Sequence, residues 1–263
     1  MVTALTIAGS DSSGGAGIQA DLKTFCSYGI YGAAVITALT AQNTIGVKEI
    51  LKVKESFVAK QLDAVLSDLK VDAVKIGMLY AKGIVKVVAQ KLIEYGVKNV
   101  VLDPVMFSKS GDALIEEDAR IVIKEKLIPI CDVITPNIFE AESLTGFSIK
   151  TIEEMKKASE RLYLLGCKNV IIKGGHLQGD AIDILYDGKG FKIIEGERIS
   201  EKNPHGTGCT FSSAIAAGLA LGYNINEAFE KAKKYVVGAI KNSFSLGKGF
   251  DLLNHTYKFY DVN

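Results

Sequence analysis

The segment Ala4-Leu5-Thr6-Ile7-Ala8-Gly9-Ser10-Asp11-Ser12-Ser13-Gly14-Gly15-Ala16-Gly17 decides the fold, because a short apolar run leads through a glycine-rich turn into a stretch of helical period. This order predicts a strand over residues 4–8 and a helix over residues 17–28. A strand followed by a helix is the first half of a unit in which right-handed helical crossovers join parallel strands. The segment therefore predicts an α/β fold with a mostly parallel sheet.

The same alternation of strands and helices continues to residue 173. It predicts further strands over residues 33–39, 73–76, 99–102, 133–135 and 170–173. It also predicts helices over residues 56–69, 81–95, 116–127, 138–144 and 152–165. Several of the strands are almost entirely apolar, which is typical of a central sheet that helices cover on both faces.

After residue 173 the pattern changes. Residues 181–186, 190–195 and 198–199 are strand-like, and the turn Asp187-Gly188 separates the first two, which predicts a small antiparallel edge. Two helices, over residues 209–221 and 225–243, then close the chain. Because there are only four prolines, no low-complexity segment and no repeat of fixed period, we predict one domain over residues 1–263.

The composition excludes several classes of partner. The chain has 263 residues and 48% hydrophobic content, which is enough for a large core. Its 31 Lys and Arg residues nearly balance 30 Asp and Glu residues, so we predict no nucleic-acid partner. No basic leader and no apolar run long enough to span a bilayer are present, which predicts a cytoplasmic protein without a membrane partner. Four scattered cysteines without a CxxC pair argue against a zinc site and a disulfide framework.

The glycine-rich turn at residues 9–17 allows backbone N–H groups to approach a ligand closely. Residues 15–20 match GxGxxA, a variant of the dinucleotide-binding pattern, and no GxxxxGK[ST] motif occurs. The dinucleotide reading needs an acidic residue about 20 positions further on, where this chain has Thr40-Ala41-Gln42-Asn43. We therefore predict an uncharged ligand that Asp21 and Gln42 recognise, with a turn that binds nothing as the alternative.

Polar residues follow several of the predicted strands, at the edge where ligands of open α/β sheets bind. Asp103 comes directly after an apolar strand and is expected to hold hydrated Mg²⁺ or a proton. Asn137 and Glu140 lie three positions apart at a helix start and could order water on Mg²⁺, while Lys173 can balance phosphate charge. A cap or a solvated charge would explain each residue alone. Together they predict a site for Mg²⁺ and phosphate.

The segment Gly206-Thr207-Gly208-Cys209 leads into a helix rich in small residues. Two glycines let several N–H groups converge, and the helix dipole adds partial positive charge, so we predict an anion hole for a phosphoryl group in transit. The same dipole predicts a lowered pKa for the Cys209 thiol, which would make it an acceptor for a hydroxyl proton. The alternatives are a buried structural cysteine and, for His205, an ordinary loop residue.

These motifs together resemble the ribokinase-like superfamily and, within it, the hydroxymethylpyrimidine kinase / hydroxymethylpyrimidine phosphate kinase family of thiamine biosynthesis. The resemblance runs from about residue 4 to the last helix. It rests on Ala8-Gly9-Ser10-Asp11-Ser12-Ser13-Gly14-Gly15-Ala16-Gly17-Ile18-Gln19-Ala20-Asp21, Thr40-Ala41-Gln42-Asn43-Thr44, Lys75-Ile76-Gly77-Met78, Asp103-Pro104-Val105-Met106, Thr135-Pro136-Asn137, Lys173-Gly174-Gly175-His176 and His205-Gly206-Thr207-Gly208-Cys209-Thr210. It implies ATP and Mg²⁺, phosphorylation of 4-amino-5-hydroxymethyl-2-methylpyrimidine and then of its monophosphate, and a homodimer.

The resemblance also implies which residues bind the pyrimidine. The ring would lie on the glycine-rich turn that begins at Gly9, with Asp21 nearby. Gln42 would hydrogen-bond the ring, and Met78 and Val105 would supply apolar walls.

A second group of residues is implied to bind the nucleotide and the metal. Asp103 and Glu140 would organise Mg²⁺, while Asn137, Lys173 and Thr207 would contact phosphates. Most sugar kinases of the superfamily have an aspartate at the position that corresponds to Cys209 here. Because phosphoryl transfer depends mainly on positioning and charge stabilisation, the cysteine argues against strong base catalysis.

Two other functions remain open at this stage. Some pyridoxal kinases share the cysteine at position 209, so pyridoxal or pyridoxine phosphorylation is the alternative activity. Residues 106–114 resemble the lid of pyrimidine kinases, and Ser108 stands where pyridoxal kinases tend to place an aldehyde-capturing cysteine, which favours the pyrimidine. A ligand-binding regulator on a kinase fold is the third possibility, and the retained Asp103, Lys173 and anion-hole glycines argue against it.

Overall fold

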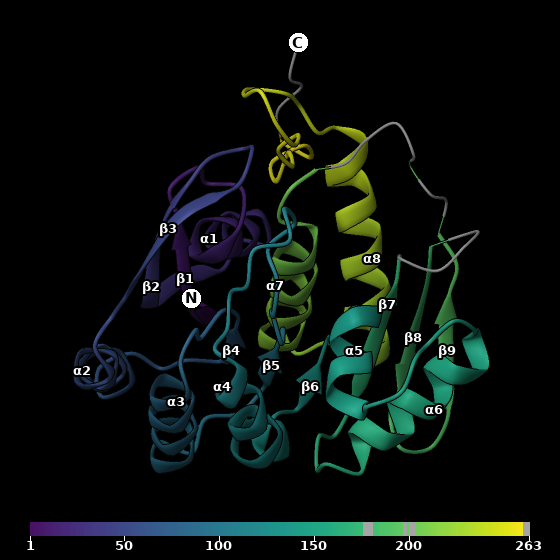
Figure 1. Cartoon of the computed structure of the whole chain (residues 1–263), viewed down its shortest axis with the longest axis horizontal. Coiled ribbons are helices and arrows are strands. Elements are labelled where there is room, and N and C mark those ends of the chain that lie inside the picture. Colours follow the sequence, from purple (N-terminus) through teal and green to yellow (C-terminus); the bar gives the residue numbers. More distant parts are fainter. Residues whose placement is uncertain (176–180, 197–198, 200–203, 260–263) are drawn as a thin grey trace.

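Nine strands form one sheet in the computed structural model, which describes residues 1–175, 181–196, 199 and 204–259 (Figure 1). Their order is β3-β2-β1-β4-β5-β6-β7-β8-β9. Their bounds are β1 (Thr3–Asp11), β2 (Tyr31–Gln42), β3 (Val47–Lys52), β4 (Ala73–Ile76), β5 (Val100–Leu102), β6 (Val133–Ile134), β7 (Val170–Gly174), β8 (Ile182–Tyr186) and β9 (Phe191–Ile194). The six central strands are parallel, whereas β3 at one edge and β8 and β9 at the other pair antiparallel. The predicted sheet type is confirmed.

Helices cover both faces of this sheet. In the described ranges they are α1 (Gly17–Ser27), α2 (Glu55–Leu66), α3 (Lys82–Glu94), α4 (Glu117–Val122), α5 (Ile138–Thr145), α6 (Ile152–Tyr163), α7 (Thr207–Ala220) and α8 (Ile225–Lys241). Because the strands are pleated, alternate side chains point to opposite faces of the sheet. Val100 and Leu102 pack in a core with α2 to α6, whereas Val101 packs in a second core with α1, α7 and α8. Figure 1 shows α7 and α8 side by side on that second face.

The structure differs from the sequence prediction at three places. The edge strand β3 was not predicted, because only three of its six residues are apolar and it pairs with β2 alone. The predicted helix over residues 116–127 is divided into α4 and a π-helical turn, Ile123–Leu127. Of the predicted strand over residues 198–199, residue 198 lies outside the described residues and residue 199 is not in a strand.

The parallel strands end level with one another, and this brings the predicted site residues together. Ile76, Leu102 and Ile134 are register partners across β4, β5 and β6. The next residues of the chain continue the same ladder, since Asp103 N donates to Ile76 O at 2.8 Å and Thr135 N donates to Leu102 O at 2.9 Å. The polar residues that follow the strands therefore share one edge of the sheet.

No helix in the described part of the chain has the length and apolar character needed to cross a membrane.

Candidate active site

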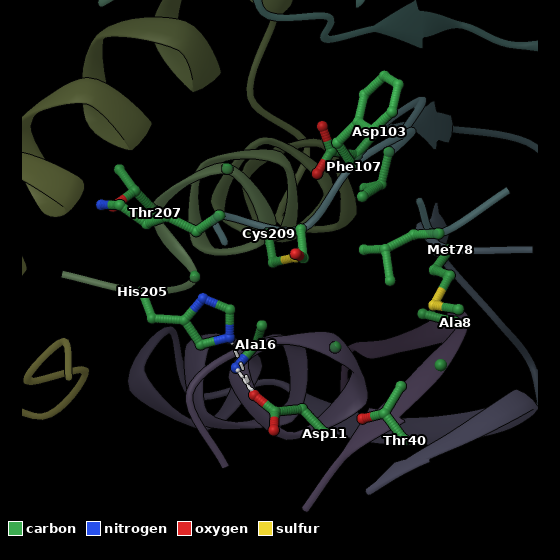
Figure 2. A pocket seen from close by; sticks show the side chains of 18 of the residues that line it. Ala8, Asp11, Ala16, Thr40, Met78, Asp103, Phe107, His205, Thr207 and Cys209 are labelled. Carbon is green, nitrogen blue, oxygen red and sulfur yellow. Dashed lines mark hydrogen bonds and ion pairs between the residues drawn. The ribbon is translucent and has the colours of Figure 1, made fainter. Parts of the chain in front are cut away.

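A cavity of about 700 Å³ opens at the carboxyl ends of the parallel strands (Figure 2). Figure 2 shows Thr207 and Cys209 from α7 facing Asp11 and Thr40 from β1 and β2. All but one of the predicted site residues line it, namely Gly9, Gln42, Met78, Asp103, Val105, Asn137, Glu140, Lys173, Gly206, Thr207, Gly208 and Cys209. The volume is within the range of sites for small ligands and cofactors.

The turn before α7 fixes the start of that helix. Gly206 has a φ of 82°, in the left-handed region that favours glycine. A Cβ atom at this position would collide with the carbonyl oxygen of Gly15, so the two glycine-rich segments of the sequence pack directly against each other. The first helical hydrogen bond of α7 is donated by Thr210 N to Gly206 O at 2.9 Å. The N–H groups of Thr207, Gly208 and Cys209 therefore come before the first hydrogen bond of the helix, and these three residues line the cavity.

Gly208 keeps the space in front of these N–H groups open. A Cβ atom here would lie 3.3 Å from Lys173 Nζ and 3.7 Å from Asp103 Oδ2. The space between the start of α7 and the Asp103–Lys173 pair is therefore not filled by a side chain. An anion in this space would meet backbone donors, the positive end of the helix dipole and an ammonium group.

Asp103, Lys173 and Glu140 form the charged wall of the cavity. Lys173 Nζ lies 2.8 Å from Asp103 Oδ1, and Thr135 Oγ1 lies 3.4 Å from the same oxygen. Burial raises the pKa of Glu140 to about 7, the Lys173 ammonium opposes this shift, and the Asp103 carboxylate adds to it. For Lys173 burial acts to lower the pKa, but the Asp103 and Glu140 carboxylates raise it. This wall carries more acidic than basic groups.

Asn137 and Glu140 also have a structural role at the start of α5. The Asn137 side chain accepts a hydrogen bond from Glu140 N at 2.9 Å, and the Glu140 carboxylate accepts one from Asn137 N at 2.8 Å. This reciprocal capping box fixes both side chains at the edge of the cavity. Their spacing in the sequence fits a cap and a ligand site equally well; the structure shows the cap, and both residues line the cavity.

The acidic wall fits a hard divalent cation. Mg²⁺ is usually held by one or two carboxylates together with waters and substrate phosphates. Asp103 and Glu140 supply two carboxylates, and Lys173 is ion-paired with Asp103. In the ranges that the structure describes, no cluster of three or more His, Cys, Asp or Glu side chains could hold a metal. Phosphate and water oxygens would therefore have to complete the coordination.

Cys209 lies in the first turn of α7, but its thiol is not acidic. Burial raises its pKa to about 11, Lys75 opposes this shift, and Asp21 and Asp103 add to it. The predicted lowering of this pKa by the helix dipole is therefore wrong, because desolvation and two nearby carboxylates outweigh the dipole. At neutral pH the Cys209 side chain is a neutral thiol.

Asp21 is the predicted residue that does not line the cavity. Its carboxylate is fully buried, and each of its oxygens lies 2.9 Å from Lys75 Nζ. Thr6 and Ser213 hydroxyl groups donate to it at 2.6 and 2.7 Å. The expectation that Asp21 contacts the pyrimidine is corrected: it lies behind the cavity wall and holds Lys75, which does line the cavity. The sequence placed Asp21 on α1 but could not show which elements that face of the helix meets.

His205 belongs to a polar cluster that the sequence did not predict. Its Nε2 lies 3.1 Å from Asp11 Oδ2 and 2.8 Å from Gln42 Nε2, and all three residues line the cavity. Burial acts to raise the pKa of Asp11, but hydrogen bonds from His205 and Ser13 lower it below its usual value. The contact joins residues 194 positions apart. The only local signal was the position of His205 directly before Gly206.

An apolar surface faces this polar cluster. Met78, Leu114 and Ala38 form a small buried cluster against which Val105 packs. A Cβ atom at Gly9 would lie only 3.0 Å from Met78 Sδ, so the glycine-rich turn lies directly on this methionine. Gly9, Met78, Val105 and Gln42 thus line the same cavity.

The fold and the site define the class of protein. A ribokinase-like sheet whose carboxyl edge bears a cavity lined by a helix N-terminus, an acidic wall and an apolar surface is the arrangement of a small-molecule kinase. The model of the phosphomethylpyrimidine kinase family matches residues 11–254, and the chain belongs to this family.

Curated relatives agree with this assignment. The chain is 53% identical over 259 residues to the thiamine biosynthesis bifunctional protein of Geobacter sulfurreducens, covering 98% of this chain and 53% of that protein. It therefore spans about half the length of that relative. It is 47% identical over 254 residues to the hydroxymethylpyrimidine/phosphomethylpyrimidine kinase of Bacillus subtilis, covering 96% of this chain and 94% of the relative.

Solved structures with high similarity carry two different names. The phosphomethylpyrimidine kinase of Clostridium difficile superposes with a TM-score of 0.82 at 47% identity, covering 91% of this chain and 100% of that one. An ADP complex of Bacillus subtilis pyridoxal kinase superposes with a TM-score of 0.90 at 39% identity, covering 98% of each chain.

Proposed function

We propose that this chain transfers the γ-phosphoryl group of ATP to 4-amino-5-hydroxymethyl-2-methylpyrimidine and then to its monophosphate, in thiamine biosynthesis. The observation that carries the proposal is one cavity that combines the anion hole of α7, the acidic wall at Asp103 and the Gly9–Met78 surface beside Gln42. Membership of the phosphomethylpyrimidine kinase family supports the same activity.

The residues of the cavity divide into two groups in this mechanism. Met78 and Val105 hold the apolar faces of the pyrimidine, and the Gln42 amide hydrogen-bonds its polar edge. The N–H groups at the start of α7 receive the γ-phosphoryl oxygens, and Lys173 offsets their charge. Because the donors are fixed by the Gly206 turn before ATP arrives, they need little reorganisation as charge develops during transfer.

Cys209 acts in this mechanism as a neutral group. With a pKa of about 11 its thiol cannot serve as a ready-made base at neutral pH. It lines the cavity near Lys75, where its sulfur can accept a weak hydrogen bond from the substrate hydroxyl. Such a role is sufficient, because phosphoryl transfer depends mainly on positioning and charge stabilisation.

We further propose that Asp103 and Glu140 bind Mg²⁺ together with the nucleotide phosphates. The ion would neutralise phosphate charge and orient the γ-phosphoryl group. Asn137 would support it through the capping box that holds the Glu140 carboxylate.

The test is a product assay with the purified chain, ATP, Mg²⁺ and the pyrimidine alcohol. Mass spectrometry over time should show the monophosphate first and the diphosphate second, with one ADP released for each step. No ADP release with this substrate would refute the proposed function. Omission of Mg²⁺ should abolish both products.

Pyridoxal phosphorylation is the second candidate, because solved pyridoxal kinases superpose on nearly the whole chain. Values of kcat/KM on pyridoxal and on the pyrimidine alcohol separate the two activities, since specificity is the ratio of these constants. We expect the ratio to favour the pyrimidine. Tight pyrimidine binding without ATP turnover would instead support a regulator that has lost catalysis.

We also propose that the chain is a single kinase domain that forms a homodimer in the cytoplasm. Leu39 of β2 and Leu51 of β3 are register partners, yet they are 43% and 62% exposed. A second copy that covers this apolar pair would remove it from water. Light scattering should show a dimer that Leu51→Lys weakens, and a monomeric wild-type chain would refute the dimer. Cell fractionation tests the location.

A further inference from the structure

The lid over the cavity presents one lysine that the mechanism above does not use. Residues 106–114 form a tight hairpin, in which Ser108 N donates to Asp112 O at 2.8 Å and Leu114 N donates to Met106 O at 2.9 Å. Asp112 also accepts hydrogen bonds from the Ser108 and Ser110 hydroxyl groups, so its charge is compensated inside the hairpin. Lys109 stands near the tip and lines the cavity.

The Lys109 ammonium group differs from the other cations of the cavity. Lys75 and Lys173 are paired with Asp21 and Asp103, whereas Lys109 makes no ion pair within the described residues. Its Nζ donates to the carbonyl oxygen of Pro204 at 2.7 Å and lies 5.4 Å from the centre of the Phe250 ring. Although the residue as a whole is exposed, burial of the ammonium end lowers its pKa to about 8, and Asp251 opposes this shift. The group is therefore still mainly charged at pH 7, with a neutral carbonyl as its hydrogen-bond partner.

The lid that carries Lys109 contacts both the start of α7 and the apolar cluster around Met78. Thr207 Oγ1 also donates to Pro204 O, at 3.3 Å, so Lys109 and the first residue of α7 meet at one carbonyl oxygen. At the base of the lid, Leu114 packs in the same cluster as Met78. The lid therefore extends from the proposed pyrimidine surface to the anion hole, and Lys109 stands at the end that adjoins the anion hole.

We propose that Lys109 binds the phosphate group of a phosphomonoester acceptor, and thereby serves the second phosphorylation and not the first. This inference rests on the proposed function. A phosphate on the acceptor must lie between the pyrimidine surface and the α7 start, because its oxygen attacks the γ-phosphorus held there. The nucleotide side already has Lys173 and the helix N-terminus, so the added charge of the acceptor requires another cation. Exchange of the Pro204 carbonyl for a phosphate oxygen gives Lys109 a charge-assisted hydrogen bond.

The two steps place different demands on the residues. In the first step the substrate hydroxyl oxygen bonds to the γ-phosphorus, and its proton passes to an oxygen of the transferred phosphoryl group or to water. The bond from that phosphorus to the β–γ bridging oxygen breaks, and its electron pair leaves on ADP. In the second step a non-bridging oxygen of the acceptor phosphate forms the new bond and the same bridging bond breaks. This acceptor is largely a dianion above pH 7, so no proton has to be removed. The second step therefore depends on cations near the acceptor and is insensitive to a proton acceptor.

The experiment compares Lys109→Met, which keeps the length of the side chain without its charge, with Lys109→Arg and with a control variant. Lys126→Met is the matched control, because this exposed lysine follows α4 and does not line the cavity. Values of kcat/KM are measured separately for the pyrimidine alcohol and for its purified monophosphate at saturating ATP and Mg²⁺. The KM for ATP and the Tm of each variant are measured in the same preparations.

We expect Lys109→Met to lose about 10- to 100-fold in kcat/KM for the monophosphate, the usual effect of removing a hydrogen bond to a charged group. The value for the alcohol and the KM for ATP should change by less than about threefold, and Lys109→Arg should restore most of the loss. An equal loss on both acceptors would assign the lysine to lid closure or to ATP and overturn the inference. An unchanged monophosphate rate would overturn it too. If the wild-type chain phosphorylates neither acceptor, the proposed function fails as a whole, whereas a variant-specific result bears on Lys109 alone.

Discussion

Replacement of Gly208 by alanine should stabilise the protein and inactivate it at the same time. Gly208 is the second residue of α7 and does not have a left-handed φ, so alanine suits its backbone. Such replacements stabilise by about 0.4–1 kcal/mol, which in a chain of this size raises Tm by about 1–4 °C. The nearest neighbour of the new methyl group is Lys173 Nζ at 3.3 Å, the end of a flexible side chain that can shift by a few tenths of an ångström. The unliganded protein therefore tolerates the change.

The same methyl group occupies the space proposed for the γ-phosphoryl group. It would lie between the backbone donors of α7 and the Asp103–Lys173 pair, 3.7 Å from Asp103 Oδ2. Loss of an oxyanion-type contact costs about 2.7–4 kcal/mol, so we expect kcat to fall at least about 100-fold. Thermal unfolding and steady-state ADP release are measured on the same samples. Full activity in Gly208→Ala would refute phosphoryl transfer at the start of α7.

Two further glycine variants serve as controls for this pair of measurements. A Cβ atom at Gly190 meets no atom within 4 Å, so Gly190→Ala should leave activity unchanged. A Cβ atom at Gly206 would instead strike the backbone of Gly15, and the φ of 82° disfavours alanine. Gly206→Ala should therefore lower both Tm and kcat. An increase of Tm in Gly206→Ala would contradict the described turn.

Three other outcomes follow from the charges around the cavity. Cys209→Ala should reduce kcat on the pyrimidine alcohol by less than about tenfold, because a thiol with a pKa of about 11 is protonated in the assay; a loss of 1000-fold or more in single-turnover kinetics would restore the case for a base. Glu140 has a pKa near 7 in the folded protein against an ordinary 4.5, so its ionisation costs stability as the pH rises from 4.5 to 7. Glu140→Gln should therefore have the higher Tm above pH 7 while losing Mg²⁺-dependent activity, and equal pH profiles of Tm would contradict the raised pKa. Asp21→Asn should lower the free energy of unfolding in urea by about 3–5 kcal/mol, because it leaves the Lys75 charge buried without its partner, and a wild-type midpoint would rule this out.

The strand ends and the two glycine-rich turns could be predicted from sequence because their signals are local. The apolar run before Asp103 predicts a strand, and the glycines around Thr207 predict a helix start, each from only a few neighbouring residues. The Asp11–His205 contact could not be predicted in this way, since it exists only after β1 and the turn before α7 are brought together. Edge strand β3 was not predicted for a related reason. Its own sequence has no clear strand pattern, and it is recognised as a strand only by its pairing with β2.

The pKa of Cys209 shows the limit of local reasoning most directly. The sequence correctly placed the residue in the first turn of a helix, where the dipole favours a thiolate. It could not show that the thiol would be partly buried, nor that Asp21 and Asp103 would lie nearby. The pKa is thus raised first by burial and then by carboxylates that are 188 and 106 positions away in the chain.

The balance of charge around the cavity explains why a neutral thiol suits this position. Lys75 compensates Asp21, Lys173 compensates Asp103, and the raised pKa of Glu140 leaves that group only partly ionised near neutral pH. A carboxylate at position 209 would add a further negative charge beside two carboxylates, and it would oppose the entry of every phosphate group. This repulsion would be strongest for an acceptor that itself carries a phosphate group. We therefore expect the neutral side chain at position 209 and the lysine at position 109, which has no ion pair within the described residues, to act together in admitting an acceptor that carries a phosphate group.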